Sequence, residues 1–341
     1  MNAVPRPHRL APNPVPIFYQ GGPGIAEFRG IDSFPSPEDW VGSVSRFPNT
    51  EDDTIGLAAT DTGDTILDLI KEDPQSWLGR DHRTDDTGIL VKLLDAGVRL
   101  PVHWHPTRAF AREHLSCPYG KAEGWIILSP HGGRVWLGFT SEPAEVQLAD
   151  WLRTQDGGDM LAHMNEVLVG YGDIVYVPPG TAHAIDQGVL LLELQEPTSF
   201  SFILEHEVFN MSSAEAALGI DWADALQSIR HAPGVADECV IAGGLRSRPT
   251  SLFPAAADEF FRASVLSPAS PRAVLDSYTI AVVIEGNGTL SASRGVDTEI
   301  GPGSTWAIPA AVGELHLVGD ATVILCRPPS QLPELDVEPR A

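Results

Sequence analysis

The stretch that decides the fold runs from Gly97 to Glu123 and reads GVRLPVHWHPTRAFAREHLSCPYGKAE. Its apolar, β-prone first part contains His103 and His105. Successive side chains of a strand point to opposite faces, so the two imidazoles share one face and Trp104 takes the other. Two imidazoles about 6 to 7 Å apart along a strand can converge on one cation. We therefore place the chemistry of the chain in this stretch.

Two later residues complete a candidate set of metal ligands. Glu123 offers a carboxylate where the expected strand 124–128 begins, and His183 follows the turn in the string GDIVYVPPGTAH, which starts at Gly172. Imidazole nitrogens and carboxylate oxygens are common ligands of divalent transition metals. The predicted metal site comprises three histidines and one glutamate: His103, His105, Glu123 and His183.

The spacing of these residues is typical of one fold. Residues 97–105 read glycine, five residues, His-x-His, and residues 172–183 read glycine, five residues, Pro-x-Gly and a histidine after two more residues. This pair of patterns resembles the signature of the cupin β-barrel. The predicted fold is mainly β, with two cupin domains (jelly-roll-like β-barrels) and a few inserted helices. A degenerate cupin whose histidines merely line the barrel is the alternative.

Several segments are expected to be helical. Apolar residues repeat at helical spacing in 64–78, where Pro74 ends or kinks the helix, and a short helix over 106–116 separates the two histidines from the glutamate. Residues 141–169 are expected to form two helices, with Asp159 as the N-cap of the second. The predicted division of the chain is a catalytic cupin domain over 1–208, a helical or loop connection over 209–245, and a second cupin domain over 246–341.

The second predicted cupin domain repeats the layout of the first without its histidines. Residues 301–310, GPGSTWAIPA, repeat the arrangement of glycine and proline. Val283, Ile284 and Glu285 stand where the first domain has His-x-His, and no histidine follows Pro309 at the expected spacing. We expect a metal-free domain that serves packing.

Composition limits the classes of partner. The chain has 341 residues, of which 43% are hydrophobic and 20% charged, as in globular proteins. We expect a cytoplasmic protein, because no apolar run is long enough to span a membrane and the N-terminus lacks the apolar core of a signal peptide. Three cysteines at wide spacing argue against a disulfide framework. A net charge of −24 disfavours nucleic acid and anionic membranes. A small molecule is the expected partner and a monomer the expected state.

Lysine is rare in this chain and occurs only at positions 71, 92 and 121. Lys92 and Lys121 flank the proposed metal strand. An amine can shuttle protons, whereas a guanidinium hardly can, so these two are the candidate catalytic residues. The alternative is that three lysines fall anywhere by chance.

The longer strings allow a family to be named. VKLLDAG from Val91, VHWHP from Val102, CPYGKAEGWIIL from Cys117 and the string from Gly172 resemble a class I mannose-6-phosphate isomerase of the shorter bacterial type. The resemblance implies a helical insertion before the metal glutamate, active-site lysines at Lys92 and Lys121, and one bound divalent metal. Zinc is the expected metal, and iron, nickel, manganese or cobalt are alternatives. The implied ligands are again His103, His105, Glu123 and His183.

Two features depart from that family. His103 stands where the family has glutamine. The family also places an arginine near the substrate phosphate in the segment after the second metal motif, and residues 199–210 contain none. Either the substrate is not phosphorylated, or its phosphate is bound by other cations. The candidate cations for binding the phosphate are Lys92, Lys121, Arg108, Arg112 and Arg134.

The expected function is a metal-dependent isomerisation of mannose 6-phosphate and fructose 6-phosphate through an enediolate. Lys121 is the first candidate for the proton carrier, and Lys92 would orient the substrate. Glu205 and His206 are further candidates for the base, with a surface role as their alternative. The other functions that fit are an isomerase or epimerase of another sugar, with or without a phosphate, a mononuclear-metal cupin dioxygenase, and a non-catalytic sugar-binding or regulatory cupin.

Overall fold

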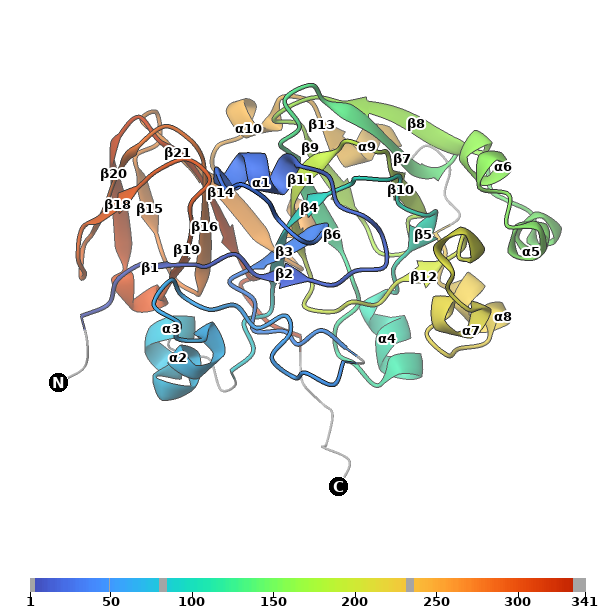
Figure 1. The fold of residues 1–341 in the computed structure, drawn as a ribbon, viewed down its shortest axis with the longest axis horizontal. Helices are drawn as coiled ribbons and strands as arrows, with labels where there is room; N and C mark the ends of the chain where they lie inside the picture. Colours follow the sequence, from blue (N-terminus) through green and yellow to red (C-terminus); the bar gives the residue numbers. More distant parts are fainter. Residues whose placement is uncertain (1–3, 49, 80–84, 231–235, 334–341) are drawn as a thin grey trace.

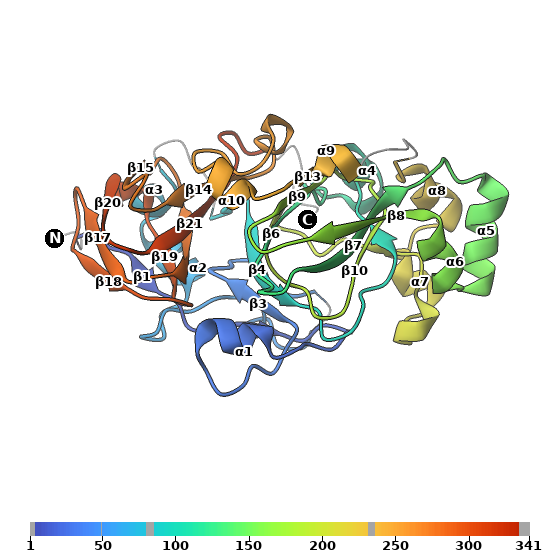
Figure 2. The same cartoon turned by 90° about the horizontal axis from the view of Figure 1, so that it is seen from above.

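The computed structural model describes residues 4–48, 50–79, 85–230 and 236–333. These residues form four β-sheets with short helices around them, which confirms the prediction of a mainly β fold. The sheets follow one another as layers along the long axis of the molecule (Figures 1 and 2).

The first pair of sheets contains the segments that carry the predicted site. The five-stranded sheet has the order β12 (Phe202–Ile203), β5 (His103–Trp104), β10 (His183–Ile185), β7 (Gly133–Phe139) and β8 (Met164–Val169). The seven-stranded sheet has the order β13 (Val240–Ile241), β9 (Ile174–Val177), β6 (Glu123–Ile127), β11 (Leu190–Gln195), β4 (Leu90–Asp95), β3 (Glu38–Val41) and β2 (Pro14–Val15).

The second pair of sheets is built mainly from the last quarter of the chain. Its five-stranded sheet has the order β1 (His8–Arg9), β19 (Thr305–Ile308), β16 (Thr279–Glu285), β21 (Thr322–Arg327) and β14 (Arg262–Leu266). Its four-stranded sheet has the order β15 (Arg272–Val274), β20 (Glu314–Gly319), β17 (Gly288–Ala292) and β18 (Thr298–Ile300). Strand β1 therefore joins the N-terminus to the sheet of the C-terminal part, while the division at residues 208 and 245 stays a prediction.

The helices are short and lie at the ends and edges of the sheets (Figure 1). The α-helices are α1 (Gly24–Arg29), α2 (Ile66–Glu72), α3 (Pro74–Leu78), α4 (Arg108–Leu115), α5 (Glu145–Thr154), α6 (Gly157–Ala162), α7 (Ser213–Ala216), α8 (Trp222–Gln227), α9 (Ala236–Cys239) and α10 (Gly244–Ser247). The 3-10 helices are η1 (Glu207–Phe209), η2 (Ala255–Ala257) and η3 (Ala310–Val312). In the described part of the chain, no helix has the length and apolar character needed to cross a membrane.

Capping residues explain where the predicted helices begin. The side chain of Thr65 accepts a hydrogen bond from the backbone N–H of Asp68 and starts α2, and Asp73 starts α3 with Pro74 at its first position. Thr107 caps α4 in the same way. The break at Pro74 and the helix of the insertion are therefore as predicted.

The prediction of two helices over 141–169 is wrong in its last part. Helices α5 and α6 occupy residues 145–162, and Asp156, not Asp159, caps α6. Met164–Val169 is strand β8, which pairs antiparallel with β7. Its residues alternate between more and less buried positions, and it contains the β-branched Val167 and Val169. Pairing with a neighbouring strand thus outweighs the local helical pattern.

The seven-stranded sheet is buried on both faces, which explains its apolar sequence runs. Leu192 and Leu194 of β11 pack on the side of the second pair of sheets, whereas Leu191 packs into the first pair. Val91 and Leu93 of β4 likewise face the second pair. The residues between them, including Lys92 and Glu193, are left to face the interior of the first pair, where the site lies.

One apolar core joins the two pairs of sheets. Ile126 from β6 belongs to the same buried cluster as Val282 of β16 and Ile324 of β21. Close approach is visible at Gly124, where an added Cβ would lie 2.5 Å from the ring of Phe253. The sheet that carries the site is therefore supported from behind by the C-terminal part of the chain.

Candidate metal centre and active site

Three histidines meet between neighbouring strands of the five-stranded sheet. His103 starts β5 and stands opposite His183 of β10 in the antiparallel register, and His105 follows β5. All three are buried, and each offers a nitrogen within 4.8 Å of the others. Trp104 packs on the opposite side against Phe202, as the alternation of a strand predicts.

Hydrogen bonds fix how the three imidazoles are oriented. Each Nδ1 can donate to a backbone carbonyl oxygen, which leaves the lone pair of Nε2 for the interior. Nε2 of His183 is buried and has no hydrogen-bond partner among the described residues. A buried imidazole nitrogen whose lone pair has no hydrogen bond is suited to bind a cation. The carbonyl oxygens belong to Pro101 for His103 (2.8 Å), Phe200 for His105 (2.8 Å) and Thr181 for His183 (2.9 Å).

Glu123 lies beside this cluster at the start of β6. Its carboxylate oxygens lie 2.7 Å from Nε2 of His105 and 3.5 Å from Nε2 of His183. The indole N–H of Trp125 donates to the same carboxylate at 3.1 Å. Burial alone would raise the pKa of Glu123, but His105 and Lys121 outweigh it and hold that pKa well below its ordinary range. The carboxylate is therefore ionised and available as a ligand.

The protonation states also fit a metal. Burial lowers the pKa of His105 to about 3, and burial together with the neighbouring imidazoles lowers the pKa of His103 well below its ordinary value. Burial also lowers the pKa of His183. Three neutral imidazoles and one carboxylate leave a divalent cation with a net charge of about +1. The buried cluster therefore fits a divalent metal site.

Lys121 is brought to the glutamate by the loop that precedes β6. Its backbone N–H donates to the carbonyl oxygen of Pro106 at 3.1 Å, so this loop runs against the segment that follows His105. Gly120 permits the approach, because an added Cβ would lie 2.5 Å from the same carbonyl oxygen. The ammonium Nζ then lies 2.8 Å from Glu123 Oε1 and 3.3 Å from His105 Nε2.

Lys92 belongs to a second polar cluster on the seven-stranded sheet. Its Nζ lies 3.2 Å from Glu38 and 3.5 Å from Glu193. Tyr19 and Trp40 donate hydrogen bonds to Glu38 at 2.6 and 2.7 Å. Burial alone would lower the pKa of Lys92, but the two carboxyl groups outweigh it and raise that pKa above its ordinary value. Lys92 is therefore a fixed positive charge.

Glu193 is a site residue that the sequence analysis missed. Burial, followed by repulsion from Glu123, raises the pKa of Glu193 to about 8, although Lys92 opposes the shift. Its carboxyl group is thus mostly protonated at neutral pH. The available signal was a single carboxylate within the apolar run LLLELQ at 190–195, where an unpaired charge would be costly.

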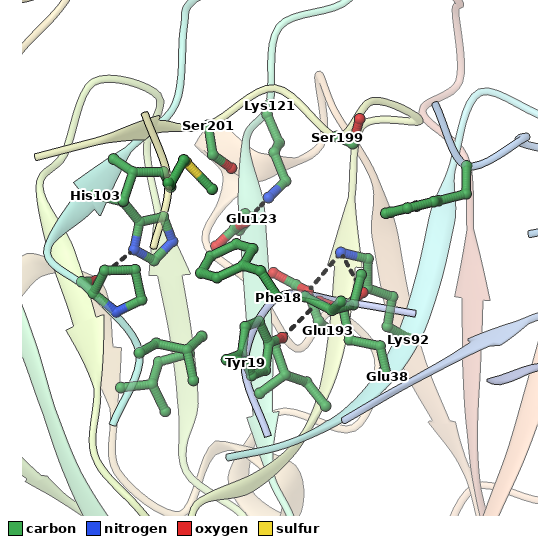
Figure 3. Close-up of a pocket in the computed structure, with 18 of the residues that line it drawn as sticks. Phe18, Tyr19, Glu38, Lys92, His103, Lys121, Glu123, Glu193, Ser199 and Ser201 are labelled. Carbon is green, nitrogen blue, oxygen red and sulfur yellow. Dashed lines mark hydrogen bonds and ion pairs between the residues drawn. The ribbon is translucent and has the colours of Figure 1, made fainter. Parts of the chain in front are cut away.

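Both clusters face one cavity of about 380 Å³. Figure 3 shows His103 on one side, Glu38, Lys92 and Glu193 on the other, and Lys121 and Glu123 between them. The predicted catalytic lysines and the predicted metal ligands are therefore brought together. The described lining includes the acidic, basic and imidazole residues Glu38, Lys92, His103, Lys121, Glu123, His183, Glu193 and Glu215.

The other candidate residues do not line this cavity. Arg99 donates two hydrogen bonds to the carboxylate of Glu205, at 2.5 and 2.7 Å, and His206 stacks on Trp222. Both Glu205 and His206 are buried, so their contacts indicate structural roles and not the surface roles considered above. The arginines considered for phosphate binding, Arg108, Arg112 and Arg134, are also absent from the lining.

Arg108 instead supports the loop that carries Lys121. Its Nε lies 2.6 Å from the fully buried carboxylate of Glu196, whose other oxygen accepts from the N–H of Ala122 at 3.1 Å. Arg108→Met leaves this carboxylate without its cation. We expect the free energy of unfolding to fall by about 3 kcal/mol, measured by urea denaturation at pH 7. Arg112→Met, on the exposed side of the same helix, is the matched control, and equal stability of the two variants would contradict the assignment.

Comparisons with known proteins bear on this site and fold. No family model matches the chain. It is 26% identical over 272 residues to a probable mannose-6-phosphate isomerase of Bacillus subtilis (GmuF), which covers 78% of this chain and 82% of that protein. It is 34% identical over 115 residues to the mannose-6-phosphate isomerase of Streptococcus mutans, covering 33% of this chain and 35% of that protein.

Solved structures share the whole arrangement of sheets. A putative mannosephosphate isomerase from Archaeoglobus fulgidus has a TM-score of 0.74 at 18% identity, covering 96% of this chain and 99% of the other. The mannose 6-phosphate isomerase of Bacillus subtilis has a TM-score of 0.70 at 22% identity, covering 94% and 99%. The resemblance seen in the sequence is therefore confirmed: the chain is similar to class I mannose-6-phosphate isomerases over most of its length and has their fold.

Proposed function

We propose that the chain is a metal-dependent aldose–ketose isomerase that interconverts mannose 6-phosphate and fructose 6-phosphate through an enediolate. One observation carries the proposal: a lysine amine, Lys121, lies 2.8 Å from a carboxylate beside three converging histidines, on the wall of one cavity. The names of the relatives support the same reaction. The proposed metal is zinc, held by His103, His105, Glu123 and His183.

The chemistry of the reaction suits this donor set. A divalent ion held there would act as a Lewis acid toward the sugar oxygens, which carry the negative charge of the enediolate. The protein residues then hold the ligands in place. Backbone carbonyls fix the three imidazoles through Nδ1, and Trp125 fixes Glu123.

Proton transfer between C2 and C1 of the sugar falls to the side chains that face the cavity. Lys121 is the proposed carrier, because its amine lies next to the ligand carboxylate and can both accept and release a proton. Lys92 stays charged and is proposed to orient the sugar hydroxyls. Glu193, mostly protonated at neutral pH, can donate a hydrogen bond to a sugar oxygen on the same side.

Hydrogen exchange at the sugar carbons tests the proposed function. Metal-loaded protein is incubated in D2O with hexose phosphates and the matching free sugars, and deuterium at C1 and C2 is followed by NMR. We expect exchange and interconversion of aldose and ketose. Absence of exchange with every sugar, while the metal stays bound, would reject the isomerase. Oxygen uptake would then test the dioxygenase, which also uses histidine and carboxylate ligands.

The lowered pKa values of the histidines predict how metal binding depends on pH. Free imidazoles would protonate near pH 6.5, so each would lose metal affinity about tenfold per pH unit below that value. Here the pKa of His105 is about 3, and those of His103 and His183 are also lowered, so protons compete only at more acidic pH. We expect the zinc affinity to change little between pH 7.5 and about 6. Calorimetric zinc titrations with a competing chelator measure this, and a fall of about tenfold or more over that range would contradict it.

A further inference from the structure

We propose that this cavity recognises the sugar without a phosphate-binding charge, so that the enzyme isomerises unphosphorylated aldoses at least as efficiently as their phosphate esters. The inference rests on the proposed isomerase and concerns the part of the sugar that does not react. Its basis is the charge and polarity of the cavity wall outside the metal centre.

Both cationic side chains of the wall already have anionic partners. No arginine is among the described residues that line the cavity, and the lining lysines are Lys92 and Lys121. Lys92 Nζ lies 3.2 Å from the carboxylate of Glu38, and Lys121 Nζ lies 2.8 Å from that of Glu123. A phosphate dianion is normally bound by charge-assisted hydrogen bonds from cations or by several backbone N–H groups. The positive charge of each lysine is therefore already balanced by a buried carboxylate, so the wall outside the metal centre offers a dianion no uncompensated cation among the described lining residues.

The rest of the wall is mostly apolar. Ile203 on β12 stands opposite His103 in the sheet and lines the cavity, so the strand beside the metal centre presents an aliphatic side chain there. Figure 3 shows the ring of Phe18 lying across the cavity, with Ser199 and Ser201 near its upper edge. An apolar wall suits the C–H faces of a sugar and a neutral hydroxymethyl group, but not a dianion. The further apolar lining residues include Pro16, Ile17, Phe47, Pro48, Leu100, Met211 and Leu218.

The remaining charged residue of the lining is an anion. Glu215 is exposed and accepts hydrogen bonds from the hydroxyl and the backbone N–H of Ser212, at 2.6 and 3.0 Å. These bonds lower the pKa of Glu215, so its carboxylate is ionised at neutral pH. Together with the net charge of −24 of the whole chain, this carboxylate disfavours the approach of a phosphate dianion.

Two measurements on the full, metal-loaded chain test the inference. The first compares kcat/KM for mannose 6-phosphate and for mannose by deuterium exchange, and we expect a ratio of about 1 or less. A preference for the ester of about tenfold or more, as one charge-assisted contact would give, overturns the proposal. The second compares the binding of mannitol and mannitol phosphate by calorimetry, which requires no turnover. Loss of all exchange would reject the isomerase, whereas the binding ratio would still decide the recognition of phosphate.

A pair of variants at Met211 adds the missing charge. Met211 is partly exposed, and its contact with His206 uses its backbone carbonyl oxygen, which substitution retains. Met211→Lys adds a further cation to the lining, and Met211→Gln is a neutral control of similar length. In both measurements, we expect the preference for the phosphate ester over the neutral compound to rise about tenfold in the lysine variant. The preference should stay constant in the glutamine variant. Equal ratios in the two variants would contradict the claim that recognition of the phosphate is limited by the lack of an uncompensated cation in the wall.

Discussion

His105→Ala is expected to remove stoichiometric zinc from the protein and to lower kcat/KM by about 1000-fold or more, because stabilisation of the enediolate by a Lewis acid is lost. His105 is the histidine that contacts both Glu123, at 2.7 Å, and Lys121, at 3.3 Å. Its loss therefore removes one proposed ligand and changes the surroundings of Glu123 and Lys121. Metal content by atomic emission and turnover by deuterium exchange are the measurements.

A matched control separates this effect from a general loss of structure. His114 lies on helix α4, on the exposed part of the insertion, and His114→Ala is expected to keep both zinc and activity. Circular dichroism of the two variants should be the same as that of the parent. One zinc per chain together with undiminished turnover in His105→Ala would overturn the proposed metal centre.

Lys121→Met is expected to lower kcat by about 10² to 10⁴, the usual contribution of one general acid–base group, while zinc stays bound. The substitution keeps most of the volume of the side chain and removes the amine that lies 2.8 Å from Glu123. The KM should change much less than kcat, because the proposed role is in proton transfer. Exchange of the C2 proton with D2O should be lost to the same extent as isomerisation.

The same change at another lysine serves as the control. Lys71 is half exposed, and its contact is a weak pair with Asp85 at 3.8 Å, so Lys71→Met is expected to leave kcat unchanged. If Lys121→Met retains kcat within about threefold, the proton is carried by another group. Glu193→Gln would then be the next variant, because Glu193 faces the same cavity in a mostly protonated form.

Local sequence was sufficient to predict features that depend on residues close together in the chain. The alternation of a strand places His103 and His105 on one face, and the structure has them there with Trp104 opposite. The prolines and capping residues likewise predicted the break at Pro74 and the helix before Glu123. These features involve residues that are a few positions apart, so backbone geometry alone relates them.

Local sequence failed where a distant strand decides the outcome. Met164–Val169 has a pattern that fits a helix, yet it pairs with β7 and becomes a strand. Glu38 and Glu193 were missed for a related reason. Glu193 stands opposite Lys92 in the register of β11 and β4, and Trp40, whose indole holds Glu38, stands opposite Lys92 in the register of β3 and β4. Nothing in a window of a few residues predicts such a register.

The sequence by itself determined the class of fold and predicted the candidate donor set, because His-x-His, Lys-x-Glu and the glycine and proline turns act through short-range geometry. Only the tertiary structure decided what surrounds that set. It paired Lys92 and Lys121 with buried carboxylates, directed the considered arginines elsewhere and lined the remaining wall with apolar side chains. Whether a cation is free or paired depends on residues from several strands, and their positions are fixed by the packing of the sheets.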